Sequence, residues 1–166
     1  MILIEDTRNK EGKHSNVRRY CEKHGIELVR QALPVGDYMF PDGNISIDTK
    51  ENLQEVASNL LNRKDSSRFW REVRKARELG LKLFVLIESG PSVLNINQVP
   101  KWKSKYSTVT GRRLVDEMIR LEMAYGIVWK FCDKRSTGRV IIEILSGAEK
   151  NEQENTFLCG HTGTER

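Results

Sequence analysis

The chain has 166 residues, of which 38% are hydrophobic and 31% are charged, and its formal net charge is +5. This length suits one globular domain, and the composition is that of an α/β protein rather than a collagen-like, coiled-coil or wholly disordered chain. The longest uninterrupted apolar run covers residues 83–87, whereas a membrane span needs roughly 20 such residues. We therefore expect no membrane association.

The distribution of charge points towards a polyanionic partner. Residues 149–166 hold four acids and two bases, which gives −2 and leaves +7 on residues 1–148. Nucleic acid is the usual partner of a basic domain, although charge alone fits a basic protein without such a partner equally well.

The N-terminus has no basic start followed by an apolar stretch, so we expect no secretory signal and an intracellular protein, in the cytoplasm or nucleoid, or in the nucleus of a eukaryote. Cys21, Cys132 and Cys159 are odd in number and far apart, which predicts neither a disulfide framework nor a zinc site.

In chain order, the first half of the sequence predicts a strand over 2–4 and a helix capped by Ser15 and ended by Gly25. An extended segment over 26–33 follows. Residues 35–40 and 45–50 flank an Asp42-Gly43 turn and predict a β-hairpin. Two helices come next, one with its apolar face over 53–61 and one capped by Ser66 or Ser67 and stopped by Gly80.

The second half begins with a strand over 81–87, apolar enough to be covered on both faces as in a parallel layer. A long loop over 90–108 leads to a helix that Gly126 ends, then to a strand over 127–131, and residues 140–145 favour helix over strand. The order β-α-β-β-β-α-α-β-α-β-α predicts a layered α/β domain with a mixed sheet over 1–148. The tail over 149–166 is expected to be disordered.

The hairpin carries the candidate chemistry. Across its turn, residues whose numbers sum to about 85 lie opposite each other, so Asp37 and Asp48 become neighbours, and Lys50 leaves the same face as Asp48. Hydrolysis of a phosphodiester needs an activated water and a counter to the developing charge, which Mg²⁺ (or Mn²⁺) held by carboxylates, with a nearby lysine, can supply. Asp-x(10)-Asp-x-Lys is the spacing expected of a PD-(D/E)XK nuclease, although spacing alone favours a solvated hairpin.

Three blocks around these residues resemble the XPF-type nucleases, a branch of the PD-(D/E)XK superfamily that cuts branched DNA. The blocks read Ile4-Glu5-Asp6-Thr7-Arg8-Asn9, Leu33-Pro34-Val35-Gly36-Asp37-Tyr38 and Ile47-Asp48-Thr49-Lys50, and Arg68-Phe69 and Leu86-Ile87-Glu88 follow. The resemblance implies a restriction-endonuclease-like three-layer fold with a central mixed sheet flanked by helices. It also implies an endonuclease that cuts flaps, forks or junctions in recombination or repair, without a small-molecule cofactor.

The family's roles carry over position by position. Asp37 and Asp48 would be the metal carboxylates, Asp6 a further acid beside the metal, Lys50 the catalytic lysine, and Arg8 a phosphate or carboxylate contact. The resemblance also implies a homodimer formed near the C-terminal helices, where the chain offers apolar residues such as Ile142 and Leu145 that could equally be core.

The sequence departs from the family pattern at three places. Asn9 replaces a glutamate, the acidic block reads Asp-Thr-Lys without its arginine, and a later acid falls on Gln54, one residue before Glu55. These departures support an alternative in which the chain is a catalytically degenerate module for DNA binding or dimerisation. A junction resolvase or restriction-like nuclease is the other alternative.

The expected DNA contacts are basic residues on both sides of the hairpin in sequence: Arg8, Lys10, Lys13, Arg68, Arg71, Lys101, Lys103 and Lys105. A solvated helix face is as good an account of Arg68 and Arg71. Lysines alternate with Trp102 and Tyr106 in the long loop, which suits phosphate contacts with base stacking, although Trp102 could equally anchor the loop in the core. His14 and His24 read as structural, with a supporting role open to His14.

Overall fold

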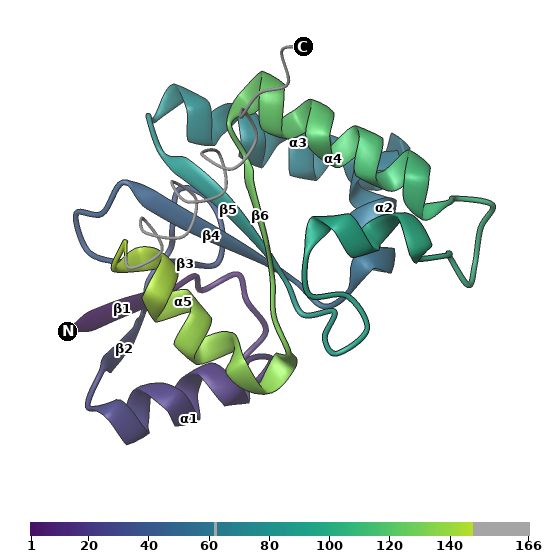
Figure 1. The fold of residues 1–166 in the computed structure, drawn as a ribbon. Helices are drawn as coiled ribbons and strands as arrows, with labels where there is room; N and C mark the ends of the chain where they lie inside the picture. Colours follow the sequence, from purple (N-terminus) through teal and green to yellow (C-terminus); the bar gives the residue numbers. More distant parts are fainter. Residues whose placement is uncertain (62, 148–166) are drawn as a thin grey trace, which may run out of the picture.

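A six-stranded mixed sheet runs through the centre of the molecule in the order β2-β1-β3-β4-β5-β6 (Figure 1). The computed structural model describes residues 1–61 and 63–147, and the side chains of residues 63–67 lie outside that description. The strands are β1 (Ile2–Glu5), β2 (Glu27–Arg30), β3 (Tyr38–Met39), β4 (Ile45–Lys50), β5 (Lys82–Ile87) and β6 (Val128–Phe131). β1 runs parallel to β2, and β4, β5 and β6 are mutually parallel, whereas β3 is antiparallel to both β1 and β4.

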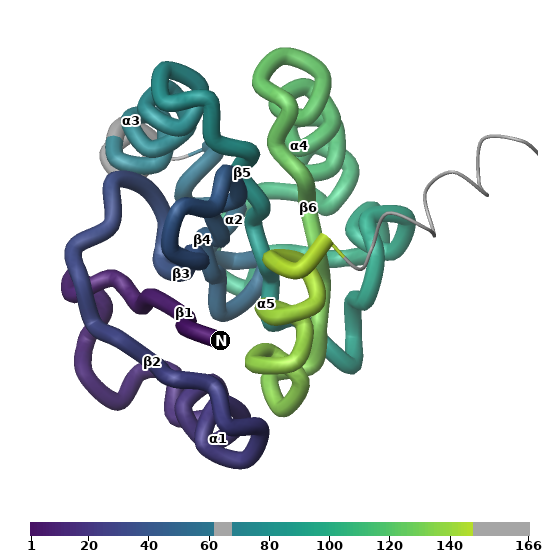
Figure 2. The backbone as a smooth tube through the Cα atoms, turned by 90° about the vertical axis from the view of Figure 1, so that its left-hand side faces the viewer, coloured from purple at the N-terminus to yellow at the C-terminus, as the bar shows by residue number. Residues whose placement is uncertain are grey.

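Helices cover both faces of this sheet, so the fold has three layers. They are α1 (Ser15–His24), α2 (Leu53–Leu61), α3 (Arg63–Glu78), α4 (Gly111–Tyr125) and α5 (Thr137–Leu145), with the short 3₁₀ helices η1 (Ile96–Lys101) and η2 (Lys134–Ser136). Figures 1 and 2 show α2, α3 and α4 on one face and α1 with α5 on the other. The three-layer α/β fold expected from the family resemblance is thus the observed fold.

Each face of the sheet has its own buried apolar cluster. The first joins β5 to α2, α3 and α4 through residues such as Val85, Leu53 and Leu114, and the second joins β4 and β5 to α1 and α5 through Ile47 and Ile141. Alternation along the strands explains the division, since Val85 and Phe84 belong to different clusters. The sheet is therefore a rigid platform fixed from both sides.

The packing of α1 against α5 depends on a glycine. A Cβ on Gly138 would lie 2.6 Å from Cβ of Tyr20, too close for two carbon atoms. Ile142 and Leu145, offered above for a dimer surface, are partly buried against the second cluster, and the dimer stays a prediction.

The sequence predicted the order of strands and helices correctly, including helix for the ambiguous stretch at α5. Two helix starts were wrong. α1 has His14 as its N-cap, without a side-chain cap bond, so Ser15 is already helical. α3 begins at Arg63 and runs through Ser66 and Ser67, so neither caps it.

The long loop over 90–108 is interrupted by η1, which the sequence did not indicate because Pro100 lies within it. The proposed tail over 149–166, with Cys159, lies outside the described residues. In the described part of the chain, no helix is long and apolar enough to cross a bilayer.

Candidate active site

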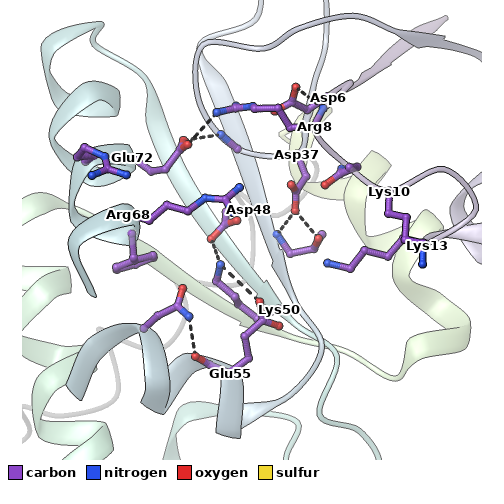
Figure 3. Close-up of a pocket in the computed structure, with 16 residues that line it drawn as sticks. Asp6, Arg8, Lys10, Lys13, Asp37, Asp48, Lys50, Glu55, Arg68 and Glu72 are labelled. Atoms are coloured by element: carbon purple, nitrogen blue, oxygen red, sulfur yellow. Dashed lines mark hydrogen bonds and ion pairs between the residues drawn. The ribbon is translucent and has the colours of Figure 1, made fainter. Parts of the chain in front are cut away.

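A pocket of about 590 Å³ opens at the carboxyl end of β4, between that strand, the loop after β1 and helices α2 and α3 (Figure 3). Its lining is dominated by charged and amide side chains: Asp6, Arg8, Asn9, Lys10, Lys13, Gly36, Asp37, Asp48, Thr49, Lys50, Glu55, Asn59, Arg68, Phe69, Arg71 and Glu72. All five residues expected to carry the chemistry lie here, although they come from three separate segments of the chain.

Lys50 and Asp48 form an ion pair on one face of β4, with Nζ 2.8 Å from Oδ2. Nζ also lies 4.0 Å from Glu55 Oε1 and 5.7 Å from the centre of the Phe69 ring. Burial acts to lower the pKa of Lys50, but Asp48 and Glu55 outweigh it and hold that pKa above its ordinary value. Burial raises the pKa of Asp48 against the opposing effect of Lys50.

Asp37 is fixed by both its main chain and its side chain. Its amide donates to Ile47 O at 2.7 Å and its carbonyl accepts from Asp6 N at 2.8 Å, which ties β3 to both neighbours. The register Tyr38↔Ile47 has the sum expected from the sequence. Oδ2 of Asp37 accepts the amide of Thr49 at 2.8 Å and also its hydroxyl.

The preceding glycine makes this approach feasible. Gly36 has φ +71°, and a Cβ there would lie 2.3 Å from Ser46 Oγ and 2.7 Å from Ile47 O. Only glycine combines that backbone conformation with such close contact to β4.

The carboxylates of Asp37 and Asp48 fit a divalent cation. Among the described residues, the partners of each carboxylate engage Oδ2 alone, so one oxygen of each remains available. Mg²⁺ typically takes one or two protein carboxylates and completes its shell with water and phosphate oxygens. In keeping with that sparse ligation, residues 1–61 and 63–147 contain no group of three or more His, Cys, Asp or Glu side chains that would form a fuller metal site.

Asp6 and Arg8 are engaged differently. Asp6, 2% exposed, accepts from Arg8 N at 3.2 Å and Leu33 N at 3.4 Å through Oδ1, and from Arg8 Nε at 2.5 Å through Oδ2. Both of its oxygens therefore already have protein donors. The metal-ligand role expected for Asp6 stays a prediction, and these contacts favour a supporting role instead.

Arg8 continues this network to α3. Its guanidinium donates to Glu72 Oε1 at 3.1 Å and to the carbonyl of Leu33 at 3.1 Å, and Glu72 Oε2 accepts from Gly36 N at 3.1 Å. The set Asp6, Arg8 and Glu72, here called the arginine clamp, thus links the loop after β1, helix α3 and the residue before Asp37 (Figure 3).

A second network reaches Asp37 from the other side of the sheet. The hydroxyl of Tyr38 donates to Glu5 Oε1 at 3.2 Å and lies 2.5 Å from Nδ1 of His14, whose Nε2 is 3.5 Å from the Thr49 hydroxyl. That hydroxyl donates to Asp37. His14 therefore has the supporting position that its sequence left open.

The first turn of α2 places an additional acid in the pocket. Asn52 Oδ1 accepts from Glu55 N at 2.9 Å, and Glu55 Oε2 accepts from Glu51 N at 2.8 Å. This reciprocal arrangement resembles a capping box. It directs Glu55 towards Lys50, while Gln54 lies outside this pocket.

Apart from Arg8, which pairs with Asp6 and Glu72, the expected DNA-contacting cations separate into three groups. Lys10, Lys13, Arg68 and Arg71 line the same pocket as the carboxylates and make no ion pair with any described side chain. Arg68 reaches from α3 towards Asp48 (Figure 3). Lys103 and Lys105 line a second pocket, and Lys101, in η1, lines neither.

Sequence reasoning missed Glu72 and the role of Thr49. Glu72 lies four residues after Arg68 on one helix, so helical spacing could have placed both on the pocket face. Thr49 points away from Asp48 along β4, and its bonds to Asp37 depend on the closeness of Asp37 to that strand. Asn9, which replaces the family's glutamate, has a buried Nδ2 without a partner among the described residues.

The family model of the ERCC4 domain matches residues 6–143. The structure of XPF from Aeropyrum pernix is similar at a TM-score of 0.64 and 20% identity, covering 95% of this chain and 69% of that one. The structure of XPF from Aeropyrum pernix in complex with DNA is similar at a TM-score of 0.65 and 20% identity, covering 99% of this chain and 76% of that one. No curated protein matches significantly.

The matched region includes every residue expected to carry the chemistry, from Asp6 to Lys50, and both similar structures share the three-layer fold. The resemblance to XPF-type nucleases is confirmed. Because the family model spans most of its length, this chain belongs to the ERCC4-domain family of nucleases.

Proposed function

We propose that the protein is a divalent-metal-dependent endonuclease that hydrolyses DNA phosphodiester bonds. One observation carries the proposal: Asp37 and Asp48 each keep an oxygen without a partner among the described residues, beside Lys50, in a pocket edged by Lys10, Lys13, Arg68 and Arg71. A purely structural cluster of this kind would pair its charges.

The position of each residue in the pocket suggests its role in the proposed reaction. Asp37 and Asp48 would hold Mg²⁺ or Mn²⁺, which when bound lowers the pKa of a water and neutralises phosphate charge. Lys50 carries a proton because of Asp48, so it orients the attacking water by donating a hydrogen bond and balances charge on the phosphorane-like transition state. Arg68 and Arg71 hold the flanking phosphates.

We further propose that the substrate is branched DNA. Family membership and the similarity to an XPF solved with DNA support a DNA substrate. The pocket lies between β4, α2, α3 and the loop after β1. A strand that can leave the duplex axis reaches such a site more easily than a continuous duplex does.

The test is cleavage of a panel of linear, flap, fork and four-way DNAs with Mg²⁺ or Mn²⁺. The panel is repeated with Asp48→Asn and Lys50→Ala, and with the matched controls Asp116→Asn and Lys23→Ala, which alter exposed residues outside the pocket. We expect cutting by the wild type and both controls only, with branched DNA preferred.

Three outcomes would count against the proposal. If all five proteins cut equally little while still binding DNA, the chain is a degenerate binding module. If Asp48→Asn and Lys50→Ala cut as well as the wild type, the activity belongs to another site or a contaminant. Equal cutting of linear and branched DNA would remove branch specificity alone.

A further inference from the structure

A second pocket, of about 420 Å³, lies between the first turn of α2, the residues that follow β5 and the loop before α4. It shares no lining residue with the first pocket. The two are nevertheless neighbours in the fold, since Gln54 lines the second pocket and the adjacent Glu55 lines the first.

The lining of this Tyr106 pocket combines an apolar floor with an aromatic rim. Leu53 and Val93 are 2% and 6% exposed, and the half-buried Trp102 packs against the first core cluster. Tyr106 is 84% exposed. A tyrosine ring so exposed beside a second aromatic is a surface on which a flat, apolar face can stack.

The same loop supplies positive charge. Lys103 and Lys105 line the pocket, are exposed, and form no ion pair within the described ranges. A loop segment in which cations alternate with aromatic residues is suited to bind single-stranded nucleic acid, because the cations contact the phosphates and the rings stack on the bases.

The loop is held in place before any ligand arrives. Ser104 Oγ donates to Gln54 Oε1 at 2.7 Å and accepts from the amides of Tyr106 and Ser107, each at 3.1 Å. Lys103 also forms a bridge with Thr110 at the start of α4. These bonds order the loop, so Tyr106 is exposed on an ordered segment. A preorganised loop loses little conformational entropy on binding.

Glu88 fixes which part of a nucleotide can enter. It lines the pocket and accepts from the Thr137 hydroxyl at 2.5 Å, and burial raises its pKa. A carboxylate there would repel a phosphate but can accept from the exocyclic amine of a base. A base would therefore face inward, with its phosphate outside along Lys103 and Lys105.

We infer that the Tyr106 pocket binds one unpaired nucleotide of the DNA strand leaving the carboxylate pocket, with its base stacked on Tyr106 and Trp102. This inference rests on the proposed function for the strand's path, and it explains how unpaired DNA would be favoured. The volume of the Tyr106 pocket is within the range of sites for small ligands, so a base fits but a duplex cannot enter.

The experiment measures binding apart from cleavage. A single-stranded oligonucleotide with one 2-aminopurine is titrated with the full chain in EDTA, and quenching of its fluorescence reports stacking. The variants are Tyr106→Ala, Tyr106→Phe and the double change Lys103→Ala with Lys105→Ala. Met123→Ala, at an 85% exposed position on α4, is the matched control.

We expect Tyr106→Ala to lose the quenching and to weaken single-strand binding about tenfold relative to duplex binding. Tyr106→Phe should keep both, because a phenyl ring stacks as well. The double lysine variant should lower the salt dependence of binding while leaving the quenching at saturation. Met123→Ala should match the wild type.

Failure of this inference is distinguishable from failure of the nuclease proposal. Cleavage that depends on Asp48 while Tyr106→Ala binds and quenches like the wild type overturns the stacking pocket alone. Quenching that depends on Tyr106 in a protein that cuts no DNA supports the pocket and overturns the nuclease. Equal weakening by Met123→Ala would show a general loss of folding and would count against the pocket.

Discussion

The two walls of the carboxylate pocket are both charged, but they are satisfied to different degrees. On the wall formed by β4 and the residue before β3, Asp37 and Asp48 each have partners at one oxygen only among the described residues. On the opposite wall, both oxygens of Asp6 accept from protein donors, and both oxygens of Glu72 are engaged, one by Arg8 and one by Gly36.

This difference distinguishes carboxylates that can bind a ligand from carboxylates that only hold the structure in place. Polar groups that satisfy each other hold a geometry but have little left to bind a substrate. Groups with spare oxygens are costly to keep close together, because the carboxylates repel, unless a cation or ligand completes them. The arginine clamp therefore holds the hairpin at its Gly36 end, and the β4 wall would carry the proposed reaction.

The largest effect should come from exchanging one carboxylate on each wall. Asp37→Asn removes a proposed metal ligand, so we expect cleavage to fall by about 100-fold or more with little change in melting temperature. Asp6→Asn should instead lower the melting temperature, because an amide cannot accept from Arg8 and Leu33 as a carboxylate does. Cleavage rates and thermal melts of both variants test this division.

A reversal of these effects would contradict the comparison. If Asp6→Asn abolished cleavage at an unchanged melting temperature and could be rescued by a higher metal concentration, Asp6 would be a ligand as the family resemblance implies. The supporting role assigned to it would then be wrong.

The next effect concerns the joint between the walls. In Gly36→Ala the new Cβ meets Ser46 and the Ile47 carbonyl, and the residue also keeps an unfavourable positive φ. We expect a loss of about 3 kcal/mol in the free energy of unfolding. Gly25→Ala is the matched control, since Gly25 has φ +64° and nothing within 4 Å of the added Cβ.

The control isolates strain from contact. Gly25→Ala should cost about 1 kcal/mol from the backbone conformation alone. Urea unfolding measures both values. Equal losses in the two variants would show that the approach of Gly36 to β4 is unimportant.

The sequence predicted the β4 wall better than the clamp. Hairpin register and strand alternation are local rules, and they placed Asp37, Asp48 and Lys50 together from their numbers alone. Glu72 lies 36 residues from Gly36, and no local period links them. The errors at Ser66 and Ser67 have another source, since a serine marks a place where a helix can begin, whereas α3 begins earlier, at Arg63.

A smaller effect is expected at Glu72 itself. Glu72→Ala removes an anchor for Arg8 and for the amide before Asp37, so cleavage should fall about tenfold, as for other residues that orient metal ligands. Glu72→Gln should recover part of the rate, because its amide oxygen still accepts from Gly36. Rates at saturating metal and DNA test this, and wild-type rates in both variants would leave the clamp without a role in catalysis.

The smallest effect should be a change in how stability depends on pH. Burial, with Lys13 and Lys134, lowers the pKa of His14 to about 4 against Glu5 and Glu51, while its unfolded value is 6.5. Below pH 6.5 the unfolded chain binds a proton at His14 that the folded chain does not bind, so stability falls as the pH drops towards 4.

His14→Gln removes this penalty. Relative to the wild type it should gain about 1 kcal/mol or less between pH 7 and pH 5, after allowance for solvent screening. Urea unfolding at the two pH values measures the gain, and an unchanged difference between the proteins would mean that His14 titrates alike in both states. A neutral His14 can donate to the hydroxyl oxygen of either Tyr38 or Thr49 without adding charge behind Asp37, so the charge of the β4 wall would come from Asp37, Asp48 and Lys50 alone.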